Sequence, residues 1–388
     1  MITLLLLLAV AGSIVYCVLA VVAVRDYLAH RVEIPPELPA ISILKPLAGA
    51  EPGLERNLRT FFEQDYPAFE ILLAVRSPDD AAIPVVEKLR GEFPQVASRL
   101  IVTGEPPYPN AKVYSLDQMK SAARHELLAM SDSDIRVTPE FLKVVAAEFV
   151  DARAGLSTCP YRAVPGLGFW SKLEALGINT QFMSGVIVAR FIEGMKFALG
   201  PTIVARRAVL DEMGGFDRLK DYLAEDFVMG KFAAELGYQV VLSTYVIEHH
   251  IGSHGFRENL DHRLRWARST RCSRPKGYLG EFFTMPVPLA LMLLLWKPAT
   301  WPVVAVALAG RFVYAWFCAE GVLHDPLTRS NWWLLPVQDM LAFGVWIAGF
   351  FGETITWRGR QYRLLEDGRF EPAGSLQSRD DITPEPRP

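Results

Sequence analysis

The strongest constraint on the fold is an apolar run near the start of the chain that carries no charged side chain. Residues 3–24 have the sequence TLLLLLAVAGSIVYCVLAVVAV, and a membrane-spanning helix needs ~20 such residues. A cleaved signal peptide is the alternative, but its usual positively charged first region is missing and the apolar run is too long for it. The sequence therefore predicts a transmembrane anchor at residues 1–25.

Two arginines, Arg25 and Arg31, follow this anchor. Positively charged side chains are in excess on the cytoplasmic side of membrane helices. We therefore expect an integral protein of the inner or plasma membrane whose next domain faces the cytoplasm. The four cysteines agree with a reducing compartment, because they are scattered and form no C-x-x-C pair typical of a zinc site or a disulfide framework.

Residues 39–280 are expected to form a globular domain outside the membrane. Hydrophobic residues make up 51% of the chain and charged residues only 21%, so the apolar excess should be concentrated in membrane segments. Within the domain, short β-rich runs alternate with charged, helix-periodic segments, which favours a mostly parallel sheet covered by helices. The net charge of −3 argues against a strongly basic nucleic-acid binder, so no nucleic-acid partner is expected.

The clearest strand and helix patterns lie in the first half of this domain. Strands are predicted at residues 40–44, 70–75, 99–102 and 127–130. Helices are predicted at residues 53–64 and 81–93, where apolar residues recur at helical spacing. The first of these helices would connect two strands by a right-handed crossover.

Apolar stretches return near the end of the chain, at residues 282–296, 301–319 and 332–351. Tryptophan flanks each stretch, and this residue prefers the membrane–water interface. The first stretch is short and contains Pro286 and Pro288, so it is either re-entrant or half of a tight hairpin. We therefore predict a transmembrane or re-entrant region at 282–352 and a tail at 353–388, of which residues 380–388 have a disordered composition.

One apolar segment within the globular domain, residues 182–197, is interrupted by Arg190, Glu193 and Lys196. Their spacing of three places these charges along one face of a helix. Such a helix suits the membrane interface and would join the domain to the bilayer. An ordinary amphipathic helix packed on the domain fits the pattern equally well.

A pair of carboxylates, Asp132 and Asp134, follows a predicted strand. Ligands of open α/β sheets bind at the carboxyl ends of the strands. Two such carboxylates can hold a hard ion such as Mg²⁺ or Mn²⁺, which bridges readily to diphosphate oxygens. No cationic partner of either side chain is apparent in the sequence, which favours a metal requirement, although D-x-D alone is also typical of a solvated turn.

Two further acidic pairs accompany this motif. Asp79 and Asp80 lie between a predicted strand and a predicted helix, where aspartate is also a natural N-cap. Glu225 and Asp226 fall in YLAEDFVMGKFAAELG, where a solvated helix face is the alternative. The order of the three acidic sites, more than any one of them, indicates a common site.

A basic segment, residues 257–274, follows and contains His262, Arg265 and Trp266. Arginine binds phosphate through a bidentate fork, and a neighbouring tryptophan can stack on a sugar or a lipid head group. A basic stretch attracted to anionic lipid is the alternative, because such stretches are common just before a membrane helix.

Taken together, these motifs resemble the ceramide glucosyltransferases and the related bacterial hopanoid-biosynthesis glycosyltransferases. That family has three spaced acidic sites and a Q/R-x-x-R-W motif, matched here by the set Asp80, Asp132, Asp226 and Arg265-Trp266. Lys112, in PNAKVYSL, is a further match, and the resemblance covers nearly the whole chain. One departure is His262, which stands where the family has glutamine or arginine and is compatible with the hopanoid branch.

The resemblance implies an α/β fold of the GT-A type that binds a nucleotide sugar through a mostly parallel sheet, with transmembrane helices at both ends. It implies transfer of a sugar from UDP-glucose or UDP-N-acetylglucosamine to a hydroxyl of ceramide or a hopanoid polyol in the bilayer. With one base and no separate nucleophile, inversion at the anomeric carbon is expected. A processive polysaccharide synthase and a catalytically silent lipid-binding scaffold are the alternatives.

The resemblance also implies roles for single residues. Asp80 would contact the uridine, Asp132 and Asp134 would hold Mn²⁺ or Mg²⁺ with the diphosphate, and Asp226 would be the catalytic base. Arg265 would neutralise the leaving diphosphate and Trp266 would shape the acceptor site. Substrate-binding roles are expected for a further set: Lys112, Glu225, which is also the alternative base, and His262.

Overall fold

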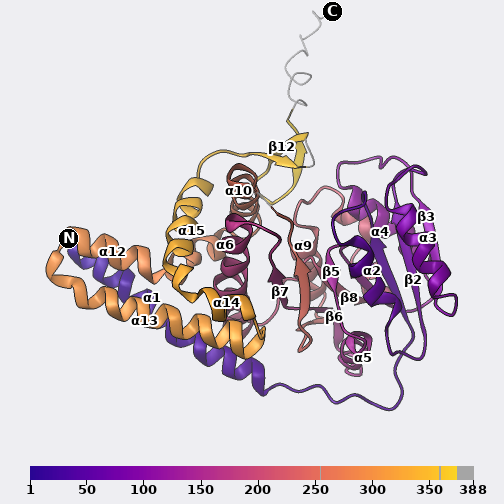
Figure 1. The fold of residues 1–388 in the computed structure, drawn as a ribbon, viewed down its shortest axis with the longest axis horizontal. Coiled ribbons are helices and arrows are strands. Elements are labelled where there is room, and N and C mark those ends of the chain that lie inside the picture. The colour runs from indigo at the N-terminus through magenta and orange to yellow at the C-terminus, as the bar shows by residue number, and fades with distance from the viewer. Residues whose placement is uncertain (254, 358–359, 374–388) are drawn as a thin grey trace, which may run out of the picture.

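A seven-stranded sheet forms the centre of the computed structural model, which describes residues 1–253, 255–357 and 360–373 (Figure 1). Its strand order is β3-β2-β1-β4-β8-β6-β9. The strands are β1 (Ile41–Pro46), β2 (Phe69–Val75), β3 (Ala97–Val102), β4 (Leu127–Ser131), β6 (Ala154–Thr158), β8 (Thr202–Arg206) and β9 (Gln239–Leu242). Only β8 runs antiparallel to its neighbours, so the predicted mostly parallel sheet is confirmed.

The four predicted strands correspond to β1–β4, and the two predicted helices correspond to α2 (Leu54–Phe62) and α3 (Ile83–Glu92). Their sequences explain this agreement, because β1 and β4 are buried on both faces and consist mainly of apolar residues. Helix α4 (Ala111–Ala122) packs on β1 and β2, and α9 (Glu225–Glu235) packs on β6 and β9. The domain also contains two short helices, α5 (Phe141–Ala147) and α8 (Arg207–Glu212).

A second, three-stranded sheet lies beside the first. It contains β5 (Ile135–Arg136), β10 (Ile247–His250) and β7 (Tyr161–Val164), in that order. Strand β5 follows β4 after a short turn, and β10 pairs with it antiparallel, so that His249 stands opposite Ile135. This pairing brings a distant part of the chain next to the turn after β4.

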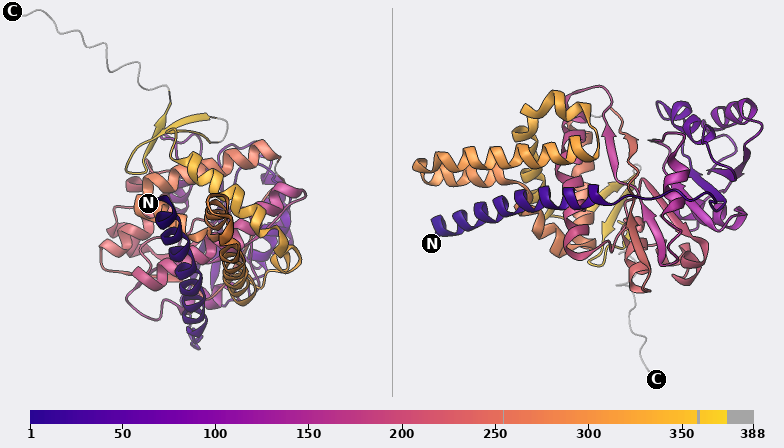
Figure 2. Two further views of the ribbon diagram at one scale, coloured as in Figure 1. Left: turned by 90° about the vertical axis from the view of Figure 1, so that its left-hand side faces the viewer. Right: turned by 90° about the horizontal axis from the view of Figure 1, so that it is seen from below.

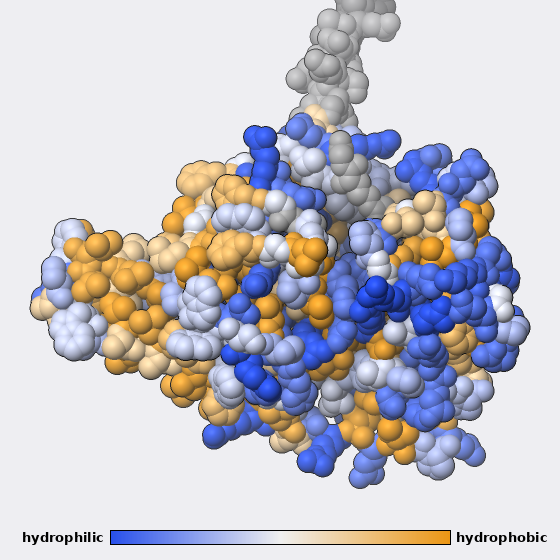
Figure 3. Space-filling view, in the orientation of Figure 1, coloured by the Kyte–Doolittle hydropathy of each residue, from blue (hydrophilic) through white to orange (hydrophobic). Residues whose placement is uncertain are grey.

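Three helices extend away from the sheet as an apolar bundle: α1 (Ile2–Ala29), α12 (Pro286–Trp296) and α13 (Trp301–Trp316) (Figures 1 and 2). At the far end of the bundle, the Trp296 indole N–H donates to the Thr3 hydroxyl at 3.0 Å. The surface of the bundle is apolar (Figure 3), and Leu4, Leu8 and Leu295 are among its most exposed side chains.

By length and composition, three helices of the described chain suit a membrane span: Ile2–Ala29, Phe169–Glu193 and Pro298–Val322. A fourth would be the pair Pro275–Thr284 and Pro286–Trp296, which is bent by 63° at its break. This bend agrees with the prediction that the proline-containing stretch at 282–296 is no simple span. The last predicted stretch contains α15 (Leu335–Gly349), a helix of 15 residues that follows the short α14 (Pro326–Asn331).

The apolar segment at 182–197 belongs to a longer helix. Helix α6 (Phe169–Gly177), a π-helical turn (Ile178–Phe182) and α7 (Met183–Glu193) run on without interruption. Helix α7 packs against α1 and buries Val186 and Ile187. The segment is therefore not a separate helix but the second half of a largely buried one. Its place at the membrane interface stays a prediction.

The three charges of that segment do not share one helical face. Arg190 pairs with Asp26 of α1 at 2.7 Å, and Glu193 pairs with Arg274. Gly194, with φ of 72°, ends the helix, so Lys196 lies outside it. The charges at 190 and 193 thus tie α7 to its neighbours.

The first part of the predicted tail is folded. Strands β11 (Thr354–Trp357), β12 (Arg360–Leu364) and β13 (Phe370–Pro372) form an antiparallel sheet, which we call the C-terminal sheet. The Phe370 amide donates to the Asp221 carbonyl at 2.9 Å, which ties this sheet to the segment before α9. The prediction of a tail beginning at 353 did not include this sheet, and residues 380–388 lie outside the described residues.

Candidate active site

The predicted acidic sites lie at the carboxyl edge of the large sheet, where β1, β2 and β4 all end. Strand β4 leads directly into Asp132, whose amide donates to the Pro201 carbonyl at 3.1 Å. The Asn57 amide group donates to the Ser133 carbonyl at 3.2 Å and fixes the following turn. The turn therefore holds both aspartates in place through main-chain contacts.

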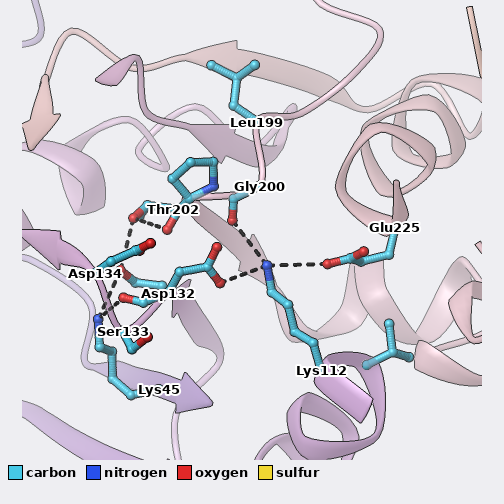
Figure 4. Close-up of polar contacts among 12 residues, drawn as sticks. Lys45, Lys112, Asp132, Ser133, Asp134, Leu199, Gly200, Thr202 and Glu225 are labelled. Atoms are coloured by element: carbon cyan, nitrogen blue, oxygen red, sulfur yellow. Dashed lines mark hydrogen bonds and ion pairs between the residues drawn. The ribbon is translucent and has the colours of Figure 1, made fainter. Parts of the chain in front are cut away.

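Lys112 joins two of the three acidic sites (Figure 4). Its ammonium nitrogen lies 2.8 Å from a carboxylate oxygen of Asp132 and 3.3 Å from one of Glu225. It also donates to the Gly200 carbonyl at 3.5 Å. No cationic partner of Asp132 is apparent in the sequence, but the fold supplies one, because Lys112 lies on α4, outside the reach of any local pattern.

Asn110 explains why α4 begins where it does. Its side-chain oxygen accepts from the Val113 amide at 3.2 Å, which caps the helix. Its amide group donates to the Tyr222 carbonyl at 2.9 Å. This fully buried residue thus positions Lys112 in the first turn of α4 and anchors the chain that leads to Glu225.

A second lysine, Lys45 of β1, lies beneath the turn after β4 and is completely buried. It donates to the Asp132 carbonyl and, at 3.3 Å, to the Ser131 hydroxyl. Its ammonium group also lies 3.8 Å from the centre of the Phe61 ring, a cation–π contact. Burial lowers the pKa of Lys45 to about 7, although Asp132 and Asp134 oppose that shift.

Lys45 belongs to none of the acidic or basic motifs. Its one signal in the sequence is that it is the single lysine in the otherwise apolar strand ISILKP. A lysine in a buried strand needs a partner, and the sequence alone does not name it.

Asp134 is paired with His249 of β10, whose Nε2 lies 3.1 Å from the carboxylate. Burial raises the pKa of Asp134, but His249 and Lys45 outweigh this effect and hold the pKa below its ordinary value. For His249 burial lowers the pKa, and Asp134 raises it above the ordinary value. No motif indicates this histidine, which reaches the site through the pairing of β10 with β5.

Asp226 is the second residue of α9. Burial, followed by the neighbouring Glu225, raises its pKa to about 6, while Lys112 opposes the shift. Gly200 makes room for this carboxylate, because a Cβ atom at position 200 would lie 2.7 Å from an Asp226 oxygen. The structure therefore brings Asp226 close to the Lys112 group and allows it to exchange a proton near neutral pH.

Asp80 has a different set of contacts. One carboxylate oxygen accepts from the amides of Gly49 at 3.0 Å and Ala82 at 2.9 Å. It thus fixes the loop at 47–53 to the entry of α3. That loop reaches the turn after β4, since the Ser133 hydroxyl donates to Glu51 at 3.4 Å.

His262, Arg265 and Trp266 lie on α10 (Phe256–Ser273), which precedes the short α11 (Pro275–Gly280). The Nδ1 atom of His262 lies 2.5 Å from the buried carboxylate of Glu174, and its ring lies 5.0 Å from that of Trp266. Arg265 is half-buried on the same helix. His262, which stands where the family motif has glutamine or arginine, therefore has a carboxylate partner, Glu174 of α6.

A row of aromatic rings connects α10 with the acidic residues. The Trp266 ring lies 6.1 Å from Phe182, Phe182 lies 5.8 Å from Tyr161, and Tyr161 lies 5.4 Å from His249. Phe182, on the π-helical turn, is the exposed member, at 37%. The row thus runs from α10, past the long apolar helix, to His249, the partner of Asp134.

Two arginines of the basic segment have structural partners. Arg268 donates to the carbonyls of Phe351 and Thr354, and Arg271 donates to those of Phe350 and Gly352. These bonds hold the connection between α15 and the C-terminal sheet. They favour a structural role for this end of the segment over attraction to lipid.

Two atoms suited to bind a divalent ion lie in the pair of Asp134 and His249. The second carboxylate oxygen of Asp134 and the Nδ1 atom of His249 are buried without a hydrogen-bond partner. Within residues 1–253, 255–357 and 360–373, no three acidic, histidine or cysteine side chains are grouped so that they could hold an ion. Carboxylate oxygen and imidazole nitrogen are donor types that suit Mn²⁺, and carboxylates suit Mg²⁺. Asp132 would complete such a site only by giving up its contact with Lys112.

Residues 4–370 match glycosyl transferase family 21. The chain belongs to this family. Ceramide glucosyltransferase 1 of Caenorhabditis elegans is 25% identical over 387 residues, which cover 96% of this chain and 83% of that protein. Ceramide glucosyltransferase of Komagataella phaffii is 32% identical over 143 residues, which cover 34% of this chain and 28% of that protein. The predicted resemblance to ceramide glucosyltransferases is confirmed.

Among solved structures, the chain is similar to the mannosyltransferase PcManGT from Pyrobaculum calidifontis in complex with GDP-Man and Mn²⁺. The TM-score is 0.55 at 16% sequence identity, with coverage of 90% of this chain and 99% of the other. This likeness concerns the fold alone. It agrees with the predicted GT-A-like fold of the α/β class.

Proposed function

We propose that this family 21 glycosyltransferase moves a sugar from a UDP-sugar to a hydroxyl of a membrane lipid, with inversion at the anomeric carbon. The observation that carries the proposal is the contact of Lys112 with both Asp132 and Glu225. This contact links Asp132, which would hold the diphosphate, to Glu225, the neighbour of the candidate base Asp226. An apolar bundle joined to the same domain supports a lipid acceptor.

On the donor side, Asp132 and Asp134 would hold Mn²⁺ or Mg²⁺, with His249 as a nitrogen donor. When bound, the ion supplies positive charge beside the donor diphosphate. Lys112 would turn from Asp132 toward a phosphate oxygen. Asp80 would contact the uridine from the loop that it fixes, in agreement with its bond to the Gly49 amide.

On the acceptor side, Asp226 takes the proton of the attacking hydroxyl. With a pKa of about 6 it is mostly ionised at neutral pH and still basic enough to accept a proton. As the new glycosidic bond forms, the bond to the diphosphate breaks, and the negative charge that develops is stabilised by Lys112 and Arg265. Glu225 is the alternative base, but its contact with Lys112 makes it better suited to holding that lysine.

The names of the relatives favour ceramide as the acceptor and glucose as the sugar. A hopanoid polyol with UDP-N-acetylglucosamine is the second candidate, and the Glu174–His262 pair is the observation that favours it. A head group with several hydroxyls could bond to both members of that pair. Trp266 and the exposed Phe182 would line the route of the lipid from the bilayer.

The domain is proposed to face the cytoplasm, because Arg25 lies in the last part of α1 and Arg31 follows the helix. Positively charged side chains are in excess on the cytoplasmic side of membrane helices. A processive synthase is less favoured, because the described chain has three or four candidate spans and the export of a polymer needs a larger bundle. A silent scaffold is also less favoured, because the structure brings Lys112, Asp132 and Glu225 together in one site.

The test is transfer by the purified full-length protein in lipid nanodiscs. UDP-glucose and UDP-N-acetylglucosamine are each supplied with ceramide or a hopanoid polyol, and the lipids are analysed by mass spectrometry. We expect one glycosylated lipid with the wild type and none with Asp226→Asn. Absence of both product and donor hydrolysis over the whole panel would favour the scaffold.

A further inference from the structure

A cleft of about 790 Å³ lies between the C-terminal sheet and the segment that leads into α4. This volume is within the range of small-molecule sites, roughly 300 to 1,000 Å³. One wall is formed by Arg76 and residues 105–109, and the other by Trp357, Arg360 and Tyr362. The cleft is therefore shared between the GT-A-like domain and the last strands of the described chain.

The cleft lies close in the chain to residues that are proposed to bind the donor. Arg76 directly follows β2, only a few residues before Asp80. Ala111 also lines the cleft, and the next residue is Lys112, which contacts Asp132. In Figure 1, the C-terminal sheet, labelled by β12, lies well away from the far end of the bundle of α1, α12 and α13. A lipid in the membrane would reach the site from the bundle, so the cleft suits the sugar-nucleotide donor.

The lining has the chemistry of a nucleoside site. Tyr108, Trp357 and Tyr362 are aromatic, and base–aromatic stacking contributes roughly 1–3 kcal/mol per base in nucleic-acid complexes. Arg360 can stack on a base through its planar guanidinium group. Three prolines at 106, 107 and 109 fix the backbone of one wall, so this wall needs little ordering when a ligand binds.

We propose that the nucleoside end of the sugar nucleotide occupies this cleft and that the C-terminal sheet is a wall of the donor site. The proposal rests on the proposed function, since it takes a nucleotide sugar as the donor. The same sheet is bonded to Asp221 and Leu223, directly before Glu225 and Asp226. A nucleoside held between the sheet and Tyr108 would therefore be positioned relative to the candidate base.

The experiment measures binding of UDP and of inorganic diphosphate to the full-length protein by calorimetry, with Mn²⁺ present throughout. The variants are Tyr108→Ala and Arg360→Gln, and Tyr108→Phe keeps the ring. The matched control is Arg363→Gln, on the same strand as Arg360 but paired with Glu353 at 3.1 Å and outside the described lining.

We expect Tyr108→Ala to weaken UDP binding about tenfold, from the loss of one stacking contact. Arg360→Gln should weaken it severalfold, whereas Tyr108→Phe and Arg363→Gln should bind UDP like the wild type. Inorganic diphosphate should bind equally to all of them. UDP affinities of Tyr108→Ala and Arg360→Gln within twofold of the wild type would overturn the proposed cleft. A wild type that binds no UDP would instead overturn the proposed function.

Discussion

The replacement Asp226→Asn should lower the rate of transfer but raise the stability of the fold. The carboxylate is needed as a base, yet its ionised form is unfavourable in the folded protein. An amide has the shape of the carboxylate but cannot accept the proton of the acceptor hydroxyl. The loss of a general base lowers the rate by roughly 10²- to 10⁴-fold. UDP binding should stay nearly unchanged, because the diphosphate is held by other residues in our proposal.

The effect on stability follows from the pKa of Asp226, which is raised from 3.8 to about 6. This rise in the pKa makes the ionised side chain unfavourable in the folded protein by at most about 3 kcal/mol. The penalty is absent below the unfolded-state pKa, appears between about pH 4 and 6, and is complete above pH 6. Because asparagine does not ionise, Asp226→Asn should be more stable than the wild type at pH 7.5, with little advantage near pH 4.

The assay is thermal unfolding of both proteins in one detergent at pH 4.5, 6 and 7.5, together with transfer at pH 7.5. The midpoint of Asp226→Asn should exceed that of the wild type by an amount that grows with pH. Asp217→Asn is the matched control, since it makes the same replacement at an exposed carboxylate that pairs with Lys220. Transfer within tenfold of the wild type would reject Asp226 as the base, and a midpoint lower at pH 7.5 would contradict the pKa argument.

Gly200→Ala should lower transfer by up to about 10²-fold with little change in UDP affinity, because its Cβ would lie 2.7 Å from an Asp226 oxygen; unchanged transfer would speak against the placement of Asp226. Lys112→Met should weaken UDP binding roughly tenfold or more in calorimetry, and equal affinity would remove this lysine from the donor site. Excess chelator should weaken UDP binding to the wild type more than to Asp132→Asn, whereas equal affinity with and without chelator would contradict a metal. In Asp79→Cys, the new thiol should react with an impermeant maleimide in inside-out vesicles, and labelling in intact cells would place the domain outside.

The sequence pattern predicted the part of the fold that depends on local apolar spacing. Strands β1, β2 and β4 are apolar runs that are buried in the sheet, and such runs stand out in the sequence. Strand β3 lies at the edge of the sheet and is more exposed. The long helix from Phe169 to Glu193 was only half recognised, because its first half contains Ser171, Lys172 and Glu174. Ser171 and Glu174 are buried and form hydrogen bonds with residues of other segments, Gly252 and Asn259.

The candidate site was predictable only where its residues form motifs. Asp132 and Asp226 stand in short acidic motifs, but Lys45 and His249 do not. Lys45 meets Asp132 through the pairing of β1 with β4, and His249 meets Asp134 through that of β10 with β5. These pairings join residues about a hundred positions apart, so only the folded chain identifies the cations that balance the acidic cluster.

The packing of α1 has a consequence for how the protein is made. Ala20, Ala23 and Val24 of α1 belong to the same hydrophobic core as the strands of the large sheet, and α1 also contacts α12 and α13. About 250 residues separate Ala29 from Pro286, so the ribosome needs roughly 12 to 50 s to supply those later helices. During that time, one side of α1 has only lipid or insertion factors as partners. A truncation that removes α1 to obtain a water-soluble enzyme would leave a hole in the core and should yield aggregates.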